Sequence, residues 1–376
     1  MSVYLDYNAS APILPEVLEA MVSVYRNTPG NADSRTHIFG TNAAKAVQNS
    51  RASIASILAV DPSEVIFTSG STESNNTAIL GIEEYARATK KMHIITTAIE
   101  HKAVLEPLKY LEGRGFSVDY VKPDESGRIN SETLLSKVRN DTVLVSVMFV
   151  NSETGIIQPV EEIGRALKKK KVLFHVDATQ ALGKLNDRIR NLDYDMMSIA
   201  AHKIGGPQGI GALILKRDEQ YKRPPITPLM YGGHQEHGFR PGTTPVALVV
   251  GFATAMEYAE KNLDRNMKEC QRIKDTFFDV IKDLPYTLNG DPNFCLPSTV
   301  NLSIDGLDAE AAFLCLGDSY SFSNGSACNS SSHSLSYVLE AMGLSEKRKS
   351  EAIRLSWSGT EKIDFSEFVS IVASML

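Results

Sequence analysis

The feature that most constrains the fold is an alternation of short, β-rich apolar runs with amphipathic helical stretches, from about residue 60 to residue 215. Strands that alternate with helices in this way form a parallel sheet covered by helices. The runs predict strands at 65–68, 93–97, 143–150, 172–177, 195–200 and 211–215. The pattern therefore predicts an α/β fold with a mainly parallel sheet.

The pattern changes in the last third of the chain. Residues 246–284 are almost wholly helical in pattern, and a strand (298–304), helices, a second strand (353–357) and a final helix follow. This order is typical of a smaller α+β unit. We expect a large domain at 15–255 and a small domain made of 1–14 and 256–376.

Composition narrows the function classes. The 376 residues are 43% hydrophobic and carry a net charge of −6, so the overall field repels phosphate backbones and no direct nucleic-acid binding is expected. No apolar run approaches the ~20 residues of a membrane span, and the start, MSVYLDYNASAP, lacks the order of a signal peptide. We expect a cytoplasmic protein without membrane contact.

The four cysteines show no C-x-x-C spacing, which argues against a zinc site or disulfide framework.

The first chemical cluster is FTSGSTESNN, where a strand ends and a helical stretch begins. Ser71 and Thr72 then lie at a helix N-terminus, where backbone N–H groups, two hydroxyls and the positive end of the dipole suit a phosphate. Taken alone, this turn is more commonly a helix cap without a ligand.

The second cluster is FHVDATQ, which places Asp177 at the end of an apolar strand. The carboxyl edge of an open parallel sheet normally hosts ligands, and an acid there can pair with a protonated ring nitrogen. A helix cap is an equally good interpretation of Asp177 alone.

The third cluster is MMSIAAHKIGGPQGIGAL, in which Lys203 follows another strand. Small neighbours let a lysine approach a flat ring, and partial desolvation favours the neutral amine that Schiff-base chemistry requires. Most single lysines are surface charges. The GGPQGIG tract does not have the G-x-G-x-x-G order of a dinucleotide site.

A phosphate cradle, an acid for a ring nitrogen and a Schiff-base lysine are together the requirements of pyridoxal phosphate (PLP). The chain also resembles, nearly end to end, the class-V aminotransferase-like cysteine desulfurases of the NifS/IscS type. The resemblance implies the PLP-dependent transferase fold of the aspartate aminotransferase type. The matching stretches are YLDYNASAP, NADSRTHIFG, FTSGSTESNN, TAIEHKAV, VNSETG, HVDATQALGK, SIAAHKIGGPQGIGAL, FRPGT, SNGSACNSSSHSLSYVL and IRLSWS.

The resemblance implies a cofactor role for each matching residue. Lys203 is implied to form the Schiff base and to move the Cα proton, and Asp177 to pair with the pyridine nitrogen. His101 is implied to stack on the ring as an acid or base, although in EHKAV a histidine at a helix start is ordinarily a surface residue. Gln180 is implied to donate to the ring hydroxyl. The implied phosphate contacts are Ser71, Thr72 and His202.

The resemblance also implies residues for the substrate and for a partner subunit. Asn151 and Arg354 match groups that hold the carboxylate of the substrate L-cysteine, which a guanidinium binds bidentately. Thr243, in RPGT, matches a residue that reaches the phosphate of the neighbouring subunit, which implies a homodimer.

Cys328 distinguishes sulfur transfer from transamination. It lies in SFSNGSACNSSSHS, a run of small polar residues that is typical of an exposed, flexible loop. We expect Cys328 to attack the sulfur of L-cysteine, to carry it as a persulfide to an acceptor protein, and to leave L-alanine. An aminotransferase or selenocysteine lyase would share Lys203 and Asp177 but would not need this cysteine, and a non-catalytic adaptor would need none of the three.

The sequence departs from the family pattern at several positions. Ala11 and Ala200 replace hydroxyl residues, and His237 stands where an arginine is frequent. His234 and His237 form an H-x-x-H pair, but no acidic or cysteine partner has suitable spacing, so no metal is expected. The chain ends at Leu376 without the longer segment that docks an iron-sulfur scaffold in housekeeping members, so tRNA-thiolation proteins and the DNA phosphorothioation machinery are also expected as acceptors.

Overall fold

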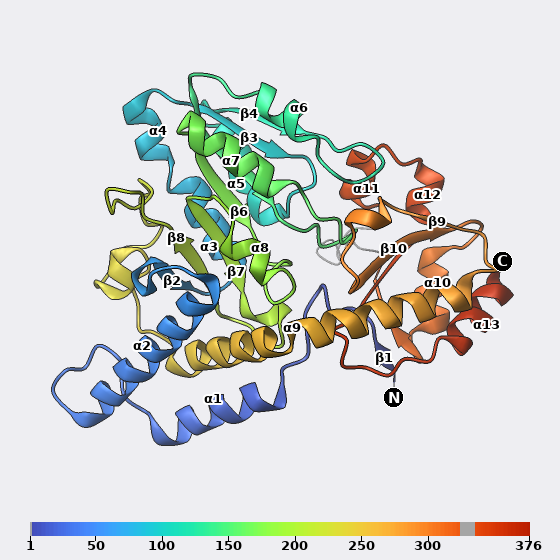
Figure 1. Ribbon diagram of the computed structural model, residues 1–376, viewed down its shortest axis with the longest axis horizontal. Helices are drawn as coiled ribbons and strands as arrows, with labels where there is room; N and C mark the ends of the chain where they lie inside the picture. The colour runs from blue at the N-terminus through green and yellow to red at the C-terminus, as the bar shows by residue number, and fades with distance from the viewer. Residues whose placement is uncertain (1, 324–334) are drawn as a thin grey trace.

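The computed structural model describes residues 2–323 and 335–376 and is built around a seven-stranded sheet (Figure 1). The strand order is β2-β8-β7-β6-β5-β3-β4. All the strands expected between residues 60 and 215 are present, and β4 is an additional, half-exposed edge strand whose sequence, SVDYV, lacks an apolar run. The strands are β2 (Val65–Thr68), β3 (His93–Thr97), β4 (Ser117–Val121), β5 (Thr142–Met148), β6 (Leu173–Asp177), β7 (Met196–Ala200) and β8 (Gly211–Leu215).

The sheet is mainly parallel, as expected. Strands β4, β3, β5, β6 and β7 pair in parallel, whereas β8 runs antiparallel to both β7 and β2. Two reversals restore the original direction, so β2 runs the same way as β7. The carboxyl ends of β2, β3, β5, β6 and β7 therefore meet at one edge of the sheet.

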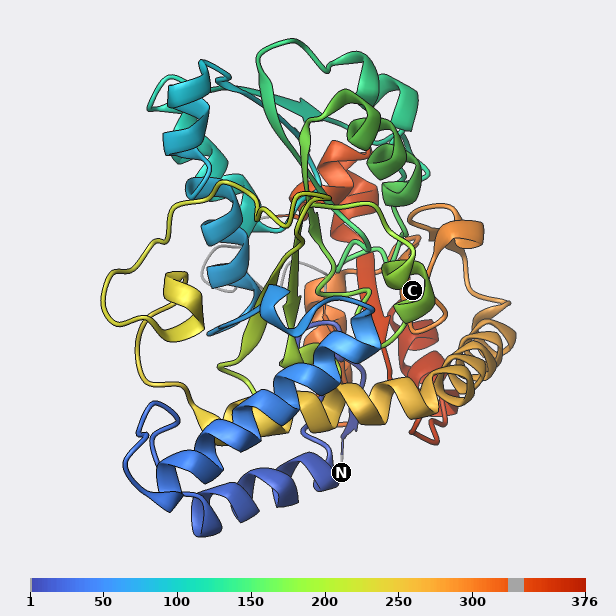
Figure 2. The same cartoon turned by 60° about the vertical axis from the view of Figure 1, so that its left-hand side comes forward.

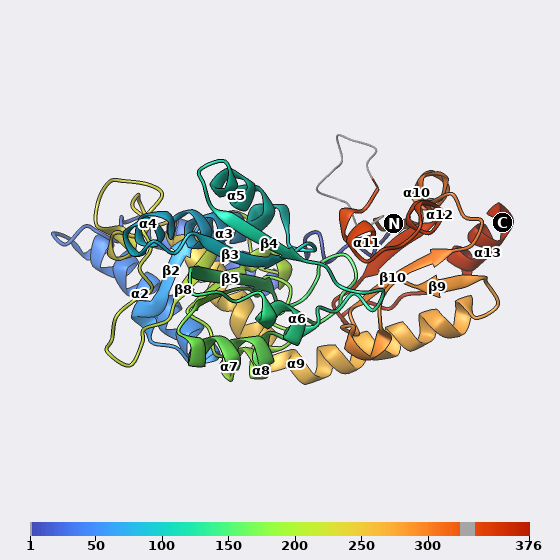
Figure 3. The same ribbon diagram turned by 90° about the horizontal axis from the view of Figure 1, so that it is seen from above.

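Helices cover both faces of this sheet, and alternate strand residues feed two cores (Figure 3). In β7, for example, Met196 packs with the core under α3–α5, while Met197 packs with the core on the opposite face. One layer consists of α3 (Ser71–Leu80), α4 (Glu83–Thr89) and α5 (Lys102–Glu112). The other includes α2 (Ile38–Leu58), α6 (Ser131–Ser136), α7 (Val160–Lys170) and α8 (Asn186–Arg190).

A 36-residue helix, α9 (Val246–Ile281), runs the length of the molecule (Figures 1 and 2). At 1.5 Å per residue it is about 54 Å long. Its first part packs against α1 (Pro15–Asn27) and α2, and its last part packs into a separate core with Phe277 and Ile281. The helix therefore contributes residues to both cores.

The second core belongs to a smaller α+β unit, as the change of pattern predicted. An antiparallel sheet of order β12-β10-β9 is accompanied by a parallel pair of β1 and β11. Its elements are β1 (Val3–Tyr4), β9 (Tyr286–Leu288), β10 (Thr299–Ile304), β11 (Tyr320–Ser321), β12 (Ala352–Ser356), α10 (Ala309–Leu316), α11 (Tyr337–Ala341), α12 (Glu346–Ser350) and α13 (Ser366–Met375). The division at 15–255 stays a prediction, and its second boundary falls inside α9.

Among the helices of the described residues, none is both long enough and apolar enough to cross a membrane.

Phe277 is expected to be a principal stabilising residue of the second core. Its fully buried ring lies 5.0 Å from that of Phe365 and 5.8 Å from that of Phe368, centroid to centroid. Phe277→Ala should lower the free energy of unfolding by about 3–5 kcal/mol, because it removes buried area and leaves a cavity. Leu314→Ala, at a side chain that is 86% exposed, is the control and should change it by less than about 0.5 kcal/mol. Urea unfolding measures both, and equal effects would contradict the packing described.

Candidate active site

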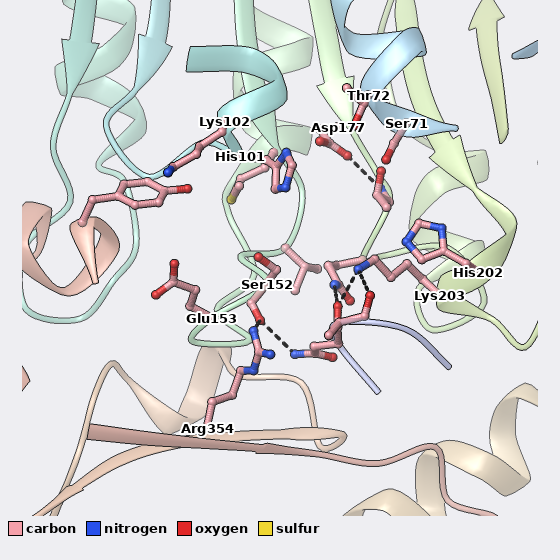
Figure 4. Close-up of a pocket in the computed structure, with 17 residues that line it drawn as sticks. Ser71, Thr72, His101, Lys102, Ser152, Glu153, Asp177, His202, Lys203 and Arg354 are labelled. Carbon is pink, nitrogen blue, oxygen red and sulfur yellow. Dashed lines mark hydrogen bonds between the residues drawn. The ribbon is translucent and has the colours of Figure 1, made fainter. Parts of the chain in front are cut away.

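A cavity of about 400 Å³ lies at the carboxyl edge of the large sheet, between that edge and β12 (Figure 4). Its walls come from strand ends, from the N-terminal segment and from the smaller unit. Of the residues expected from the sequence, the cavity brings together Ser71, Thr72, His101, Asp177, Gln180, His202, Lys203 and Arg354.

One end of the cavity is suited to an anion. Ser71 and Thr72 are the first residues of α3, and the preceding Gly70 has no side chain to cap the helix amides. These amides and the helix dipole remain directed at the cavity end. His202 lies at the same site, and burial together with Lys203 and His101 lowers its pKa to about 4. Its imidazole is therefore neutral at physiological pH.

Asp177 ends β6 with its carboxyl group held from two sides. One oxygen accepts from the Asn75 side-chain amide at 2.8 Å, and the other accepts from the Thr179 backbone N–H at 3.0 Å. The residue is 6% exposed and lines the cavity. Its carboxyl group therefore has one orientation, which suits recognition of a fixed partner.

Lys203 ends the short 3₁₀ helix η2 (Ala201–Lys203) that follows β7. Its ammonium donates to the carbonyl oxygens of Asn8, at 2.6 Å, and Ala9, at 2.8 Å. These carbonyls belong to the N-terminal segment, so the lysine links that segment to the strand end. The amine itself is directed into the cavity region shared with Asn8 (Figure 4).

Gln180 and His101 also have defined orientations. The Gln180 Nε2 donates to the Asn8 carbonyl oxygen at 2.8 Å. His101 is the N-cap of α5, and its Nδ1 accepts from the Ala103 backbone N–H at 3.0 Å. Because Nδ1 accepts, the ring proton is on Nε2 in this arrangement. The helix start that seemed unremarkable in the sequence thus fixes the His101 ring.

The two expected carboxylate-binding residues are placed differently. Arg354, on β12, is 2% exposed and lines the cavity, where it donates to the Ser152 carbonyl at 3.1 Å and pairs with Asp6 at 2.5 Å. Asn151 is buried beside the cavity but is not among its lining residues. Its Oδ1 accepts from the N–H groups of Glu153 and Thr154, which shapes the turn after β5. A direct substrate contact of Asn151 stays a prediction.

Other expected residues lie elsewhere. Thr243 is exposed in the segment before α9 and is not one of the residues that line this cavity. Cys328 lies outside the described residues. His234 and His237 line a different cavity, and within 2–323 and 335–376 no three potential metal ligands gather.

Sequence reasoning missed several residues of the site. Asn75 orients Asp177, Asn8 accepts from Lys203, and Glu153 lines the cavity. Each was visible in a matched stretch, in FTSGSTESNN, YLDYNASAP and VNSETG, but none has a local pattern that reveals its partner. Such pairings depend on distant parts of the chain.

Two buried acids lie at or beside the cavity. Burial raises the pKa of Glu153 to about 7, although a 2.5 Å bond from the Ser336 hydroxyl and the charges of Arg354, His101 and Lys102 act against the shift. Burial likewise raises the pKa of Glu100 to about 8. Its Oε1 accepts from Thr97 at 2.6 Å and from the Met148 N–H at 2.9 Å. Glu100 is therefore largely protonated at neutral pH.

The fold and this site define the class of the protein: a PLP-dependent enzyme with the aspartate aminotransferase-like fold. The cavity holds the donor set that this cofactor needs, with a helix N-terminus, a buried acid and a lysine amine on one sheet edge. The model of the class-V aminotransferase family matches residues 3–356.

Known proteins narrow the class further. The human cysteine desulfurase is 40% identical over 369 residues, which cover 97% of this chain and 80% of that protein. A solved NifS-like protein superposes with a TM-score of 0.90 at 36% identity, covering 100% of this chain and 98% of the other. A structure described as SspA in complex with cysteine gives 0.83 at 35% identity, with 96% and 99% covered. The chain belongs to the class-V aminotransferase family and, within it, to the cysteine desulfurases.

The protonated state of Glu100 has a measurable consequence for stability. The folded state keeps this proton up to about pH 8, whereas an unfolded carboxyl releases it near its model value of 4.5. The contribution of Glu100 to the free energy of unfolding is therefore fully present below about pH 4.5. It is lost as the pH rises toward 8, by an amount on the order of a few kcal/mol. Glu100→Gln has no such proton and should flatten this dependence.

Urea unfolding across this pH range tests the prediction. Glu132→Gln, at an exposed glutamate, is the matched control. Its free energy of unfolding should change with pH as steeply as that of the wild type. A wild-type slope in Glu100→Gln as well would contradict the assignment.

Proposed function

We propose that this enzyme converts L-cysteine to L-alanine and transfers the sulfur to Cys328 as a persulfide. The single observation that carries the proposal is the meeting of Lys203, Asp177 and Arg354 in one cavity with a helix N-terminus. The first two residues and the helix suit PLP, and Arg354 suits the carboxylate of an amino acid.

PLP, when bound, supplies an electron sink for the substrate Cα. We propose that Ser71, Thr72 and His202 hold its phosphate, and that Asp177 pairs with its ring nitrogen. Gln180 would donate to its ring oxygen, and His101 would lie against its ring. The contacts that orient Asp177 and His101 support this arrangement, since both side chains are fixed before any ligand arrives.

The substrate carboxylate is proposed to bind Arg354, with Asn151 shaping the adjoining turn. Arg354 is anchored by Asp6 and Ser152, which limits its rotamers and fixes the position of the guanidinium at the cavity wall. Held there, L-cysteine presents its Cα hydrogen to Lys203. The amine of Lys203 accepts that proton and later returns one to the product.

Sulfur transfer follows from attack of the Cys328 thiolate on the substrate sulfur. A sulfur–sulfur bond forms and the carbon–sulfur bond of the substrate breaks, with its electron pair left on the carbon side. That carbon gains a proton on the way to alanine, and His101 is the proposed proton carrier. One cysteine and one enzyme thiol thus give one alanine and one persulfide.

We propose an acceptor protein as the next carrier of the sulfur, for iron-sulfur cluster assembly, tRNA thiolation or DNA phosphorothioation. The net charge of −6 supports delivery to a protein rather than directly to a nucleic acid. A cytoplasmic location is proposed as well, in keeping with the free thiols of Cys270, Cys295 and Cys315.

Removal of the Cys328 thiol tests the proposed function. Cys328→Ala should lose at least about 99% of sulfide release from L-cysteine in the presence of a reductant. The variant lacks the thiolate that attacks the substrate sulfur, and proton transfer by Lys203 alone does not remove that sulfur. Cys315→Ala removes an exposed thiol elsewhere and is the matched control, with activity expected to stay near wild type. Methylene-blue detection of sulfide measures both. A Cys328→Ala enzyme with wild-type turnover would refute the role of this residue.

A homodimer is also proposed, with Thr243 reaching the partner's phosphate site. Exposed apolar side chains support it: Ile38 and Phe39 at the start of α2 and Tyr231 in the segment before α9 are 63%, 53% and 83% exposed. A bond of 2.7 Å between Gln235 and Asp33 joins the segment just before α2 to the segment that carries Tyr231. Burial of such side chains is the usual gain of an obligate interface.

Charge introduced on this surface should separate the subunits. Phe39→Asp with Tyr231→Asp is expected to give a monomer by sedimentation and to weaken PLP retention at least tenfold. Leu314→Asp, at a side chain of α10 that is 86% exposed, should leave the dimer intact. A dimer that survives the double substitution would rule out this interface.

A further inference from the structure

Lys184 lies behind Gln180 and has no part in the proposed mechanism. Its ammonium donates to both oxygens of Gln180, the backbone carbonyl and the side-chain Oε1, each at 3.2 Å. On the other side of the amide, Nε2 donates to the Asn8 carbonyl, which also accepts from Lys203 at 2.6 Å. A continuous set of hydrogen bonds therefore connects Lys184 to Lys203.

These contacts determine the orientation of the Gln180 amide. An ammonium only donates and a carbonyl only accepts. The observed orientation places the amide oxygen against the ammonium and the amide nitrogen against the carbonyl. Rotating the amide by half a turn would set two donors against each other and two acceptors against each other. Lys184 thus keeps the Gln180 N–H groups on the cavity side.

Within the described residues, Lys184 donates to no acceptor other than the two Gln180 oxygens, and the Cys270 thiol is the one titratable group that acts on it. Among the residues that the structure describes, no carboxylate forms an ion pair with this lysine, and burial lowers its pKa to about 8. It lines a second cavity of about 250 Å³, which Lys203, Tyr258 and Trp357 also line. A half-buried ammonium without a carboxylate partner costs stability, so its contact with Gln180 is the feature that calls for an explanation.

We propose that Lys184 is a positioning residue that fixes the Gln180 amide with its N–H directed at the ring oxygen of the cofactor. The inference rests on the proposed function, in which Gln180 donates to that oxygen. The positive charge of Lys184 on the amide oxygen also strengthens the N–H as a donor.

The consequence concerns the proton shared between the cofactor and Lys203. A donor to the ring oxygen stabilises its anionic form, so the oxygen attracts the neighbouring proton less strongly. Loss of Lys184 frees the amide to rotate and removes a nearby positive charge. Both changes would favour protonation of the Lys203 nitrogen when the cofactor is bound to it.

The test is a pH titration of the visible absorbance of the PLP-loaded enzyme. In Lys184→Met the midpoint should rise by about one pH unit, since one unit is the usual effect of a lost charge or donor. Lys184→Arg keeps the charge and the donor, so its midpoint should be shifted by less than half as much as that of Lys184→Met. Lys170→Met, at an exposed lysine of α7, is the control and should titrate as wild type. A wild-type midpoint in Lys184→Met overturns the proposal.

Two further outcomes separate this inference from other failures. If wild-type protein acquires no visible band after reconstitution with PLP, the proposed function fails. A lower thermal midpoint of Lys184→Met with an unchanged absorbance midpoint would assign Lys184 a purely structural role and would also overturn the positioning role. If Lys184→Met does not fold, Lys184→Gln takes its place, and the same upward shift decides the question.

Discussion

The site depends on the direction in which β2, β3, β5, β6 and β7 run. Because all five point the same way, the helix start at Ser71, the carboxyl of Asp177 and the amine of Lys203 meet at one edge. The reversed strand β8 keeps this arrangement compact. A Cβ at Gly211 would lie 2.8 Å from the Gly70 Cα and 2.5 Å from the Ile199 oxygen, so only glycine lets β8 pass between β7 and the turn before α3.

The N-terminal segment completes the site by joining three parts of the chain. The Asn8 side chain donates to the Ser152 carbonyl at 3.1 Å and to the Thr299 hydroxyl at 3.0 Å. Its own carbonyl accepts from Gln180 and Lys203. Asn8 therefore helps to join the large sheet to the small sheet, and Arg354 on β12 is held against the strand ends by the same turn at Ser152. The proposed substrate and cofactor contacts share this frame.

Much of this could be predicted from the sequence because the signals are local. The end of an apolar run identified Asp177 and Lys203, and a hydroxyl-rich turn identified Ser71. The edge strand β4 was not predictable in this way, since its half-exposed sequence has no apolar run. The contact between Lys203 and Asn8 joins residues 195 positions apart, and no spacing rule indicates such a pair. The buried state of Glu100 likewise depends on strands that only the fold brings together.

The electrostatic balance of the cavity follows from burial rather than from composition. The chain is acidic as a whole, yet the cavity gathers Lys203 and Arg354, while His202 stays neutral and Glu100 keeps its proton at neutral pH. This balance is consistent with the proposed binding of a phosphate at one end and of a carboxylate at the other. Glu153 limits the pH range over which the cavity favours anions. Its pKa of about 7 means that it is ionised beside Arg354 at alkaline pH. An ionised Glu153 would compete with the carboxylate that we propose Arg354 binds, so binding should weaken as the pH rises, and the burial of Glu153 moves this loss to a higher pH.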